Sequence, residues 1–323
     1  MPLIDMPLEE LKTYRGRNPK PADFDAYWDR ALAEMEAVDP KLELVLSDFQ
    51  VPNAVCYDMY YDGTRGGRVH AKLAKPAKIE GRAPALLHFH GYTGASGDWT
   101  TMLSEVCEGF VVAFMDVRGQ GGTSIDKNPV EGNTYKSHII RGLDDPDPDN
   151  LFFRQIYLDT ALLAKLVMAM DDVDETRVGA SGGSQGGALT VACAALTPTL
   201  KMASPDYPFL SDYKRVWEMD LAEHAYSELK EYFRNFDPTH AREDAIFEKL
   251  GYIGLQHLAD RIKAKMLFGC GLMDNVCPAS TQFAIYNKIT APKDMVIYPD
   301  FGHEHLPGMS DRKALFFKEL LEK

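Results

Sequence analysis

The chain has 323 residues and a mass of 36.1 kDa, enough for one large α/β domain or a domain with an inserted cap. Its formal net charge of -13 argues against nucleic acid or an anionic membrane surface as partners, because their phosphates would repel the chain. Residues 1–7 lack the basic and apolar regions of a signal peptide, and no apolar run approaches the roughly 18 residues that span a bilayer. We therefore expect a cytoplasmic protein with no membrane partner.

The cysteines point to the same compartment. They are odd in number, widely spaced and never arranged as C-x-x-C, so we expect reduced thiols rather than disulfides. Two of them, Cys270 and Cys277, stay open as alternative nucleophiles. The full set is Cys56, Cys107, Cys193, Cys270 and Cys277.

The N-terminal part predicts a helix followed by antiparallel strands. Residues 23–35 place apolar side chains on one helical face, which predicts an element clamped onto the body of the protein. Alternating or apolar runs at 42–46, 55–61 and 69–74 predict strands, and the glycine-containing segment 62–67 suits a hairpin turn between the last two.

From Pro84 onward, short continuous apolar runs alternate with helical stretches, a pattern typical of parallel strands buried on both faces. The chain therefore predicts an α/β fold with a mostly parallel central sheet and helices on both faces. The expected strands are 85–90, 110–116, 178–181, 202–205, 266–269 and 295–298, and the expected helices are 152–170, 185–196 and 311–321.

Two segments interrupt this alternation. Residues 123–150 are rich in turn formers and predict a long functional loop, whose acidic cluster at 144–149 we interpret as solvated rather than cation-binding. Residues 205–256 are helical and aromatic, and an insertion between two strands at this point would lie over the carboxyl edge of the sheet. We expect one domain over 1–323 with a cap-like insertion at about 205–256.

A nucleophile elbow of the form G-x-S-x-G is predicted within residues 177–187, where a short strand meets a helix of small residues. Both Ser181 and Ser184 satisfy the pattern. With Ser181 as nucleophile, the next helix would open on Gly182-Gly183, which are poor helix formers. With Ser184, the glycines flank the strained serine and the helix continues from Gln185, so we favour Ser184.

A serine nucleophile needs a histidine base and an orienting carboxylate, which follow it in the chain order of hydrolases with parallel sheets. Asp274 and His303 each stand just beyond the carboxyl end of a predicted strand, where catalytic groups of such sheets collect. His305 is a rival base, and Asp260 and Asp300 are rival acids.

Backbone N–H groups are expected to stabilise the oxyanion of the tetrahedral intermediate. The residue after the nucleophile, Gln185, supplies one, and we assign the second to Tyr92 in the loop after strand 85–90. His88 and His90 in that strand lack a third ligand at metal-site spacing, so we interpret them as buried, hydrogen-bonded histidines and expect no metal.

The glycine-rich segment 116–122 lacks the order of a nucleotide-binding motif, so Arg118 is interpreted as a loop anchor. Aromatic side chains are expected to close the substrate pocket and favour short acyl groups. The residues assigned to this wall are Tyr92, Trp99, Tyr207 and Phe209.

Together these motifs resemble the acetyl xylan esterases and cephalosporin C deacetylases of carbohydrate esterase family seven, within the α/β-hydrolase superfamily. The resemblance implies deacetylation of small acetylated sugars and of cephalosporin C by a triad of Ser184, Asp274 and His303. It also implies backbone donors at Tyr92 and Gln185 and a hexamer. The likeness is carried by 8–11, 89–92, 118–122, 182–187, 207–211, 271–274 and 301–304.

We therefore expect a serine carboxylesterase for short acyl, chiefly acetyl, esters of carbohydrates, working without a metal or organic cofactor. Two other interpretations stay open. One is a peptidase or thioesterase on the same fold, and the other is a catalytically silent binding protein.

Overall fold

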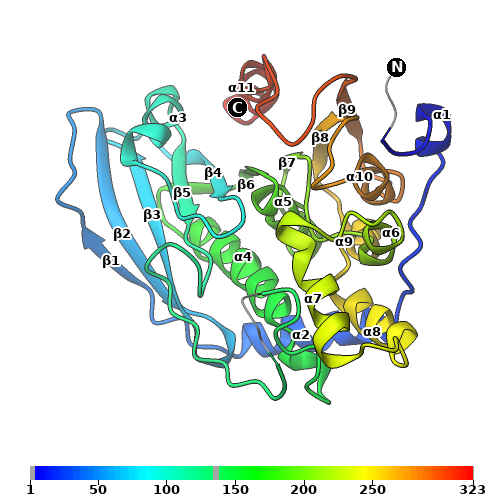
Figure 1. Cartoon of the computed structure of the whole chain (residues 1–323). Coiled ribbons are helices and arrows are strands. Elements are labelled where there is room, and N and C mark those ends of the chain that lie inside the picture. Colours follow the sequence, from blue (N-terminus) through cyan, green and yellow to red (C-terminus); the bar gives the residue numbers. More distant parts are fainter. Residues whose placement is uncertain (1–3, 134–137, 323) are drawn as a thin grey trace.

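The computed structural model describes residues 4–133 and 138–322, and a nine-stranded sheet forms its centre (Figure 1). The strand order is β1-β2-β3-β5-β4-β6-β7-β8-β9. The strands are β1 (Glu43–Leu46), β2 (Ala54–Asp62), β3 (Arg68–Pro76), β4 (Ala83–Phe89), β5 (Val111–Met115), β6 (Val173–Gly183), β7 (Met202–Asp206), β8 (Lys265–Gly271) and β9 (Lys293–Tyr298).

The sheet has an antiparallel beginning and a parallel remainder, as the sequence predicts. Strands β1, β2 and β3 pair antiparallel, and β3 also pairs antiparallel with β5. From β5 through β4, β6, β7 and β8 to β9 every pairing is parallel. The fold is that of an α/β-hydrolase, with the carboxyl ends of its parallel strands gathered at one edge.

Helices cover both faces of the sheet. Helices α2, α4 and α5 share one apolar core with Leu87 and Val111, whereas α3 and α11 share another with Leu86 and Val112. Neighbouring strand residues thus contribute to opposite cores, which is why these strands are apolar throughout. The helices are α1 (Leu8–Leu11), α2 (Phe24–Glu36), α3 (Leu103–Glu108), α4 (Phe152–Met168), α5 (Gln185–Leu196), α6 (Tyr213–Glu218), α7 (Ser227–Phe236), α8 (Glu243–Leu250), α9 (Leu255–Leu258), α10 (Ala279–Tyr286) and α11 (Met309–Phe317).

No helix in the described ranges combines the length and apolarity needed to cross a bilayer. Helices α1, α3 and α10 were not predicted from the sequence. Helix α10 is buried over most of its surface and therefore lacks the apolar and polar faces that reveal an amphipathic helix. Strand β6 is also longer than predicted, since it begins at Val173.

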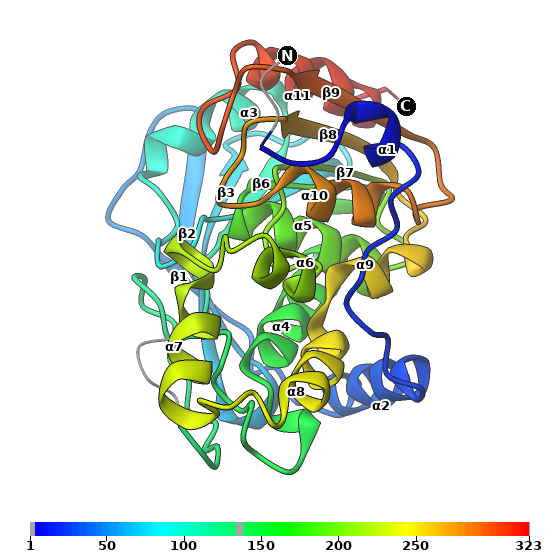
Figure 2. The ribbon, with the colours of Figure 1, turned by 45° about the vertical axis from the view of Figure 1, so that its right-hand side comes forward.

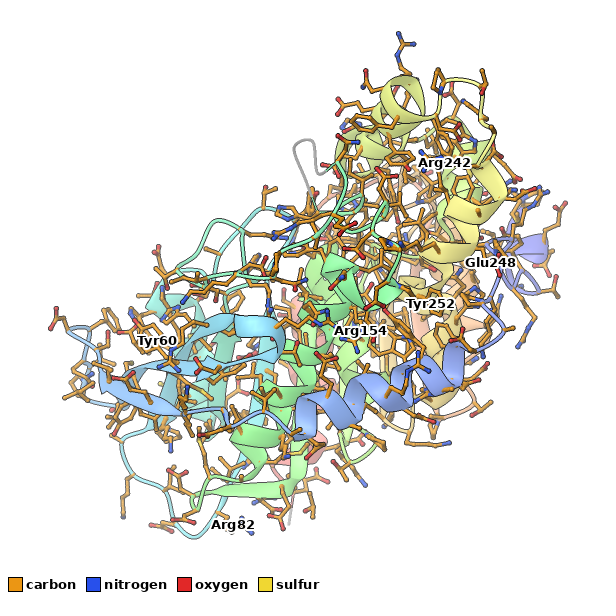
Figure 3. All side chains as sticks on the ribbon, turned by 90° about the horizontal axis from the view of Figure 1, so that it is seen from below. Tyr60, Arg82, Arg154, Arg242, Glu248 and Tyr252 are labelled. Carbon is orange, nitrogen blue, oxygen red and sulfur yellow. The ribbon has the colours of Figure 1, made fainter. Side chains whose placement is uncertain are left out.

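The N-terminal helix α2 is clamped onto the body, as predicted. The Trp28 indole N–H donates to the carbonyl of Tyr252 at 2.9 Å, and Figure 2 shows α2 beside α8. The fully buried Arg154 of α4 binds Glu34 of α2 at 2.7 Å, and Figure 3 shows Arg154 beside α2. A paired guanidinium therefore holds two helices together across the core.

The acidic segment 144–149 differs from the solvated loop that we predicted. Asp144 accepts a hydrogen bond from the Tyr232 hydroxyl at 2.5 Å and pairs at 3.1 Å with Arg242, which is labelled in the upper right of Figure 3. Lys249 donates to the carbonyl of Asp145. Side chains from the stretch between β7 and β8 therefore bind Asp144 and the backbone of Asp145, and no signal in the sequence of the acidic segment reveals these partners.

Arg118 anchors its loop from within the core. Its guanidinium is fully buried and forms a bidentate pair with Asp159, with Nε–Oδ2 at 2.6 Å and Nη2–Oδ1 at 2.5 Å. A Cβ at Gly67 would lie 2.2 Å from Arg118 Cζ, so the hairpin turn needs glycine to make room for the guanidinium. One buried ion pair thus connects the hairpin, the loop after β5 and helix α4.

We predict that Arg118→Met lowers the free energy of unfolding by about 3–5 kcal/mol, because the Asp159 carboxylate is left buried without its partner. The double variant Arg118→Met/Asp159→Leu should recover most of this loss, since it removes the buried charge as well. Urea unfolding of the three proteins measures both values. Equal losses in the single and double variants would contradict the argument.

Candidate active site

Ser184 is the single residue between the end of β6 and the start of α5. Its backbone has φ 58° and ψ −120°, a strained conformation for a residue with a side chain. The Ser184 N–H donates to the carbonyl of Asp206 at 3.1 Å, and its own carbonyl accepts from the N–H of Phe209 at 3.1 Å. The last residue of β7 and a residue just after it therefore hold the serine in its turn.

Two glycines make this turn sterically possible. A Cβ at Gly186 would lie 2.0 Å from the carbonyl oxygen of Phe89, and a Cβ at Gly182 would lie 2.5 Å from the backbone of Gly186. Neither contact is compatible with a side chain. The glycine spacing of the G-x-S-x-G motif thus follows from the close approach of β4, β6 and α5.

The structure brings Ser184, His303 and Asp274 together. The distance from His303 Nε2 to Ser184 Oγ is 3.0 Å, and that from His303 Nδ1 to Asp274 Oδ2 is 2.9 Å. Asp274 is fully buried, and its Oδ1 accepts the N–H groups of Val276 and Cys277 at 2.9 and 2.7 Å. In this arrangement the imidazole can take a proton from the serine while the carboxylate fixes its orientation.

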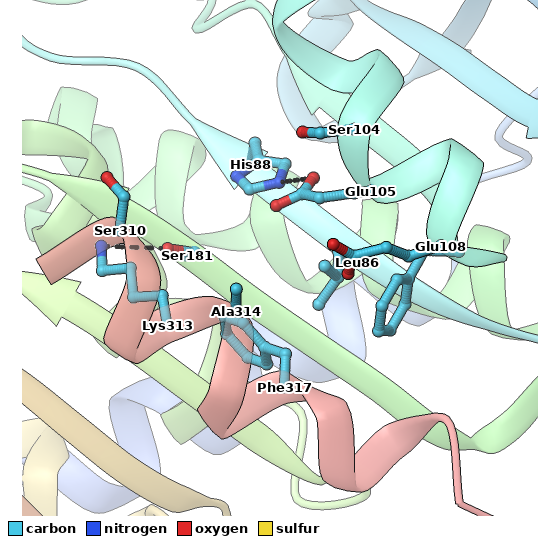
Figure 4. Close-up of a pocket in the computed structure, with 11 residues that line it drawn as sticks. Leu86, His88, Ser104, Glu105, Glu108, Ser181, Ser310, Lys313, Ala314 and Phe317 are labelled. Atoms are coloured by element: carbon cyan, nitrogen blue, oxygen red, sulfur yellow. Dashed lines mark hydrogen bonds and ion pairs between the residues drawn. The ribbon is translucent and has the colours of Figure 1, made fainter. Parts of the chain in front are cut away.

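The alternative nucleophile, Ser181, lies in different surroundings. Its hydroxyl donates to the carbonyl of Ser204 at 3.1 Å and accepts from Lys313 Nζ at 3.2 Å. It lines the cavity of about 270 Å³ in Figure 4, where His88 binds Glu105 at 2.7 Å. The proton of Ser181 is therefore committed to a backbone carbonyl.

The rival base and the rival acids differ from His303 and Asp274 in burial. His305, Asp260 and Asp300 are exposed. His88 and His90 have separate partners, because His90 accepts the N–H of Val117 at 3.0 Å through Nε2. The two histidines are hydrogen-bonded, as expected, but not to each other.

The side chain of Gln120 connects the two segments that carry the expected oxyanion donors, Gln185 and Tyr92. Gln185 opens α5, so its N–H has no partner within the helix. The side-chain amides of Gln120 and Gln185 exchange hydrogen bonds of 2.7 and 2.9 Å, and Gln120 Oε1 also accepts the N–H of Thr93, next to Tyr92, at 3.0 Å. The sequence by composition and spacing assigns no separate role to Gln120. The R-G-Q motif at residues 118–120 is the one sequence feature that points to this residue.

Aromatic rings pack around the triad, in part as predicted. The Tyr207 ring packs edge-on against His303 with centroids 4.7 Å apart, and Phe209 contacts Tyr92 at 5.5 Å. The structure does not bring Trp99 into this group. Its ring instead stacks on Phe49 at 6.0 Å within the core formed by α3 and α11.

The sequence matches the model of the acetyl xylan esterase family over residues 1–321. The chain belongs to the acetyl xylan esterase family. Acetyl xylan esterase 1 from Thermoanaerobacterium sp. is 57% identical and superposes with a TM-score of 0.96, covering 98% of this chain and 99% of that one. An acetyl xylan esterase from Paenibacillus sp. is 34% identical with a TM-score of 0.92, covering 97% and 99%.

A longer relative is also similar. The acetyl esterase Axe7A of Xylanibacter ruminicola is 28% identical over 302 residues, which make up 91% of this chain. The present chain spans 65% of the length of that protein.

In this acetyl xylan esterase family member, a buried carboxyl group joins α7 to the segment beside Tyr92. The His138 ring packs edge-on against Tyr92 with centroids 5.5 Å apart, and burial lowers the pKa of His138 to about 4. Glu228 of α7 accepts hydrogen bonds from the N–H groups of residues 138–140. Burial raises the pKa of Glu228 to about 7, so this carboxyl group holds its proton to near neutrality.

We predict that the fold loses stability as pH rises, because ionisation of Glu228 places a charge in a buried site. The carboxyl pKa is 4.5 in the unfolded chain and about 7 in the fold, so the unfolded chain binds fewer protons between these values. The free energy of unfolding should fall across this window by up to roughly 3 kcal/mol, at 1.36 kcal/mol per pH unit. Glu228→Gln should remove that fall, which urea unfolding at pH 5 and pH 8 measures. An unchanged pH dependence in the variant would refute the assignment.

Proposed function

We propose that this chain is a serine esterase that removes acetyl groups from small acetylated carbohydrates, such as xylo-oligosaccharides, and from cephalosporin C. The observation that carries the proposal is the hydrogen-bonded series Ser184–His303–Asp274, with the serine held at positive φ in a chain of the acetyl xylan esterase family. The names of the relatives support an acetylated sugar as the substrate.

The proposed mechanism follows from the positions of these groups. Ser184 Oγ attacks the carbonyl carbon of the acetyl ester while His303 Nε2 takes its proton. The N–H groups of Gln185 and Tyr92 stabilise the oxyanion, a term worth about 3 kcal/mol per donor by mutational estimate. Collapse of the intermediate breaks the bond to the sugar oxygen, which receives the proton from His303. A water molecule, activated by the same histidine, then hydrolyses the acetyl-enzyme.

We also propose that the stretch between β7 and β8, at about 205–256, forms a cap within one domain over 1–323. Phe209, buried and in contact with Tyr92 and Tyr226, supports this role, because it begins the insertion at the edge of the sheet. Together with Tyr207 these rings form the proposed acyl wall. Trp99 is not included, since it packs against Phe49.

We further propose that the protein is cytoplasmic and forms a homo-oligomer. The resemblance to acetyl xylan esterases and cephalosporin C deacetylases implies that this oligomer is a hexamer. The edge strand β1 supports association, because its apolar side chains face outward and Leu46 is 61% exposed. All five cysteines are unpaired, which is consistent with a reducing compartment.

Ser184→Ala should abolish ester hydrolysis and labelling by a fluorophosphonate, because Ser184 Oγ is the hydroxyl that lies 3.0 Å from His303 Nε2. Residual turnover should fall by about 10⁶, the loss typical of a removed triad nucleophile. Ser181→Ala is the matched control, and it should keep both labelling and activity. Loss of labelling in Ser181→Ala alone would move the nucleophile by three residues.

A hydrolysis panel tests the function itself. An extra methylene forced into a filled pocket costs about 1–3 kcal/mol, so p-nitrophenyl acetate should exceed the butyrate in kcat/KM and the octanoate should scarcely react. Acetylated xylo-oligosaccharides and cephalosporin C should be deacetylated, whereas acyl thioesters and aminoacyl amides should not be preferred. A preference for octanoate or for an aminoacyl amide would overturn the acetylesterase assignment.

A further inference from the structure

We propose that Cys277, His303 and Asp274 form an inhibitory binding site for a thiophilic divalent cation such as Zn²⁺ or Cd²⁺. The inhibition rests on the proposed serine-esterase function of the same residues, whereas the binding of the cation does not. The thiol of Cys277 takes no part in the proposed reaction, yet it lies among the side chains that are proposed to carry it out.

The geometry of the three side chains suits such a cation. One ligand atom each from Asp274, Cys277 and His303 can be chosen so that all lie within 4.8 Å of one another, and within the described ranges no other group has this property. Around tetrahedral zinc, with metal–ligand distances of 2.0–2.3 Å, neighbouring ligand atoms are roughly 3.4–3.8 Å apart. Side-chain movements of about 1 Å therefore suffice to close the site around an ion.

Local structure keeps the thiol beside the carboxylate. Cys277 follows Asp274 by three residues in one tight loop, and its N–H donates to Asp274 Oδ1 at 2.7 Å. That hydrogen bond leaves Oδ2 directed at His303 Nδ1, 2.9 Å away. The Cys277 side chain is fully buried, and its thiol lies close to the Ser184 side chain. The thiol, the imidazole and the carboxylate thus converge before any ion arrives.

The state of the thiol restricts the cations that can bind. The Cys277 thiol is fully buried beside the Asp274 loop, so an ion that binds its sulfur must displace the thiol proton. A coordinating metal ion deprotonates a thiol outright, and the released proton passes to water. Mg²⁺ and Ca²⁺ prefer oxygen ligands, so their bonds to a thiolate are too weak to offset the loss of that proton. Zn²⁺ and Cd²⁺ bind thiolate and imidazole well.

Occupation of the site blocks catalysis directly. The cation takes a nitrogen lone pair of His303, so the imidazole can no longer accept the proton of Ser184 Oγ. The ring also turns away from its 3.0 Å contact with the serine to meet the ion. Binding of the cation and modification of Ser184 should therefore exclude each other.

The first test is inhibition of p-nitrophenyl acetate hydrolysis by Zn²⁺ and Cd²⁺, with each protein compared with its own uninhibited rate. The native enzyme should be inhibited reversibly, with recovery on addition of EDTA, and Mg²⁺ should have no effect. Cys277→Ser should raise the inhibition constant at least tenfold. Cys107→Ser and Cys270→Ser are matched controls, since the first removes the exposed thiol and the second a buried one outside the cluster. Both should behave like the native enzyme.

The second test is calorimetric titration of the native protein with Zn²⁺, which needs no activity. One ion should bind per chain, and prior labelling of Ser184 with a fluorophosphonate should abolish this binding. Cys277→Ala gives an independent variant if Cys277→Ser fails to fold. Unchanged inhibition and binding in the Cys277 variants, or loss of both in Cys107→Ser, would overturn the proposal. Binding without measurable esterase activity would retain the site and reject the proposed function instead.

Discussion

The close approach of three backbone segments at Ser184 is the constraint on which the rest of the structure depends. The carbonyl of Phe89 and the backbone of Gly186 leave no space for a Cβ at either glycine of the elbow. The serine itself keeps a strained backbone because its N–H binds the carbonyl of Asp206 at the end of β7 and its carbonyl binds the N–H of Phe209. These two hydrogen bonds hold the residue where its hydroxyl lies 3.0 Å from His303 Nε2.

Buried polar pairs supply the rigidity that the elbow requires. Arg118 joins the antiparallel hairpin to α4 through Asp159, while two residues further on Gln120 exchanges hydrogen bonds with Gln185. One short loop therefore carries both a structural anchor and a tie to the proposed oxyanion donors. Because the anchor is fully desolvated, its value lies in specifying one arrangement of loops rather than in raw stability.

The stretch between β7 and β8 connects to the triad through aromatic and acidic contacts. Phe209 contacts Tyr92, and Glu228 binds the segment whose His138 also packs against that ring. On the far side, Cys277 and Asp274 share one tight loop beneath His303. The same surroundings thus also bring a soft thiol next to His303, the proposed base, which is the physical origin of the proposed metal sensitivity.

The sequence by itself determined the parallel sheet, the antiparallel start and the elbow. These features are local, because apolar runs, turn glycines and strand ends are written in consecutive residues, and the order of serine, aspartate and histidine restricts the candidates further. The hydrogen bonds of Ser184, His303 and Asp274 join residues that sequence order had selected.

Only the tertiary structure decided which distant residues meet. Trp99 stacks on Phe49 instead of facing the triad, and the acidic segment at Asp144 is neutralised by Arg242, 98 positions away. Helix α10 lacks a polar face and so escaped detection. The proximity of the Cys277 thiol to His303 is likewise a contact that the sequence does not predict. A side chain's partners depend on how strands and loops pack in three dimensions, and no spacing along the chain records that packing.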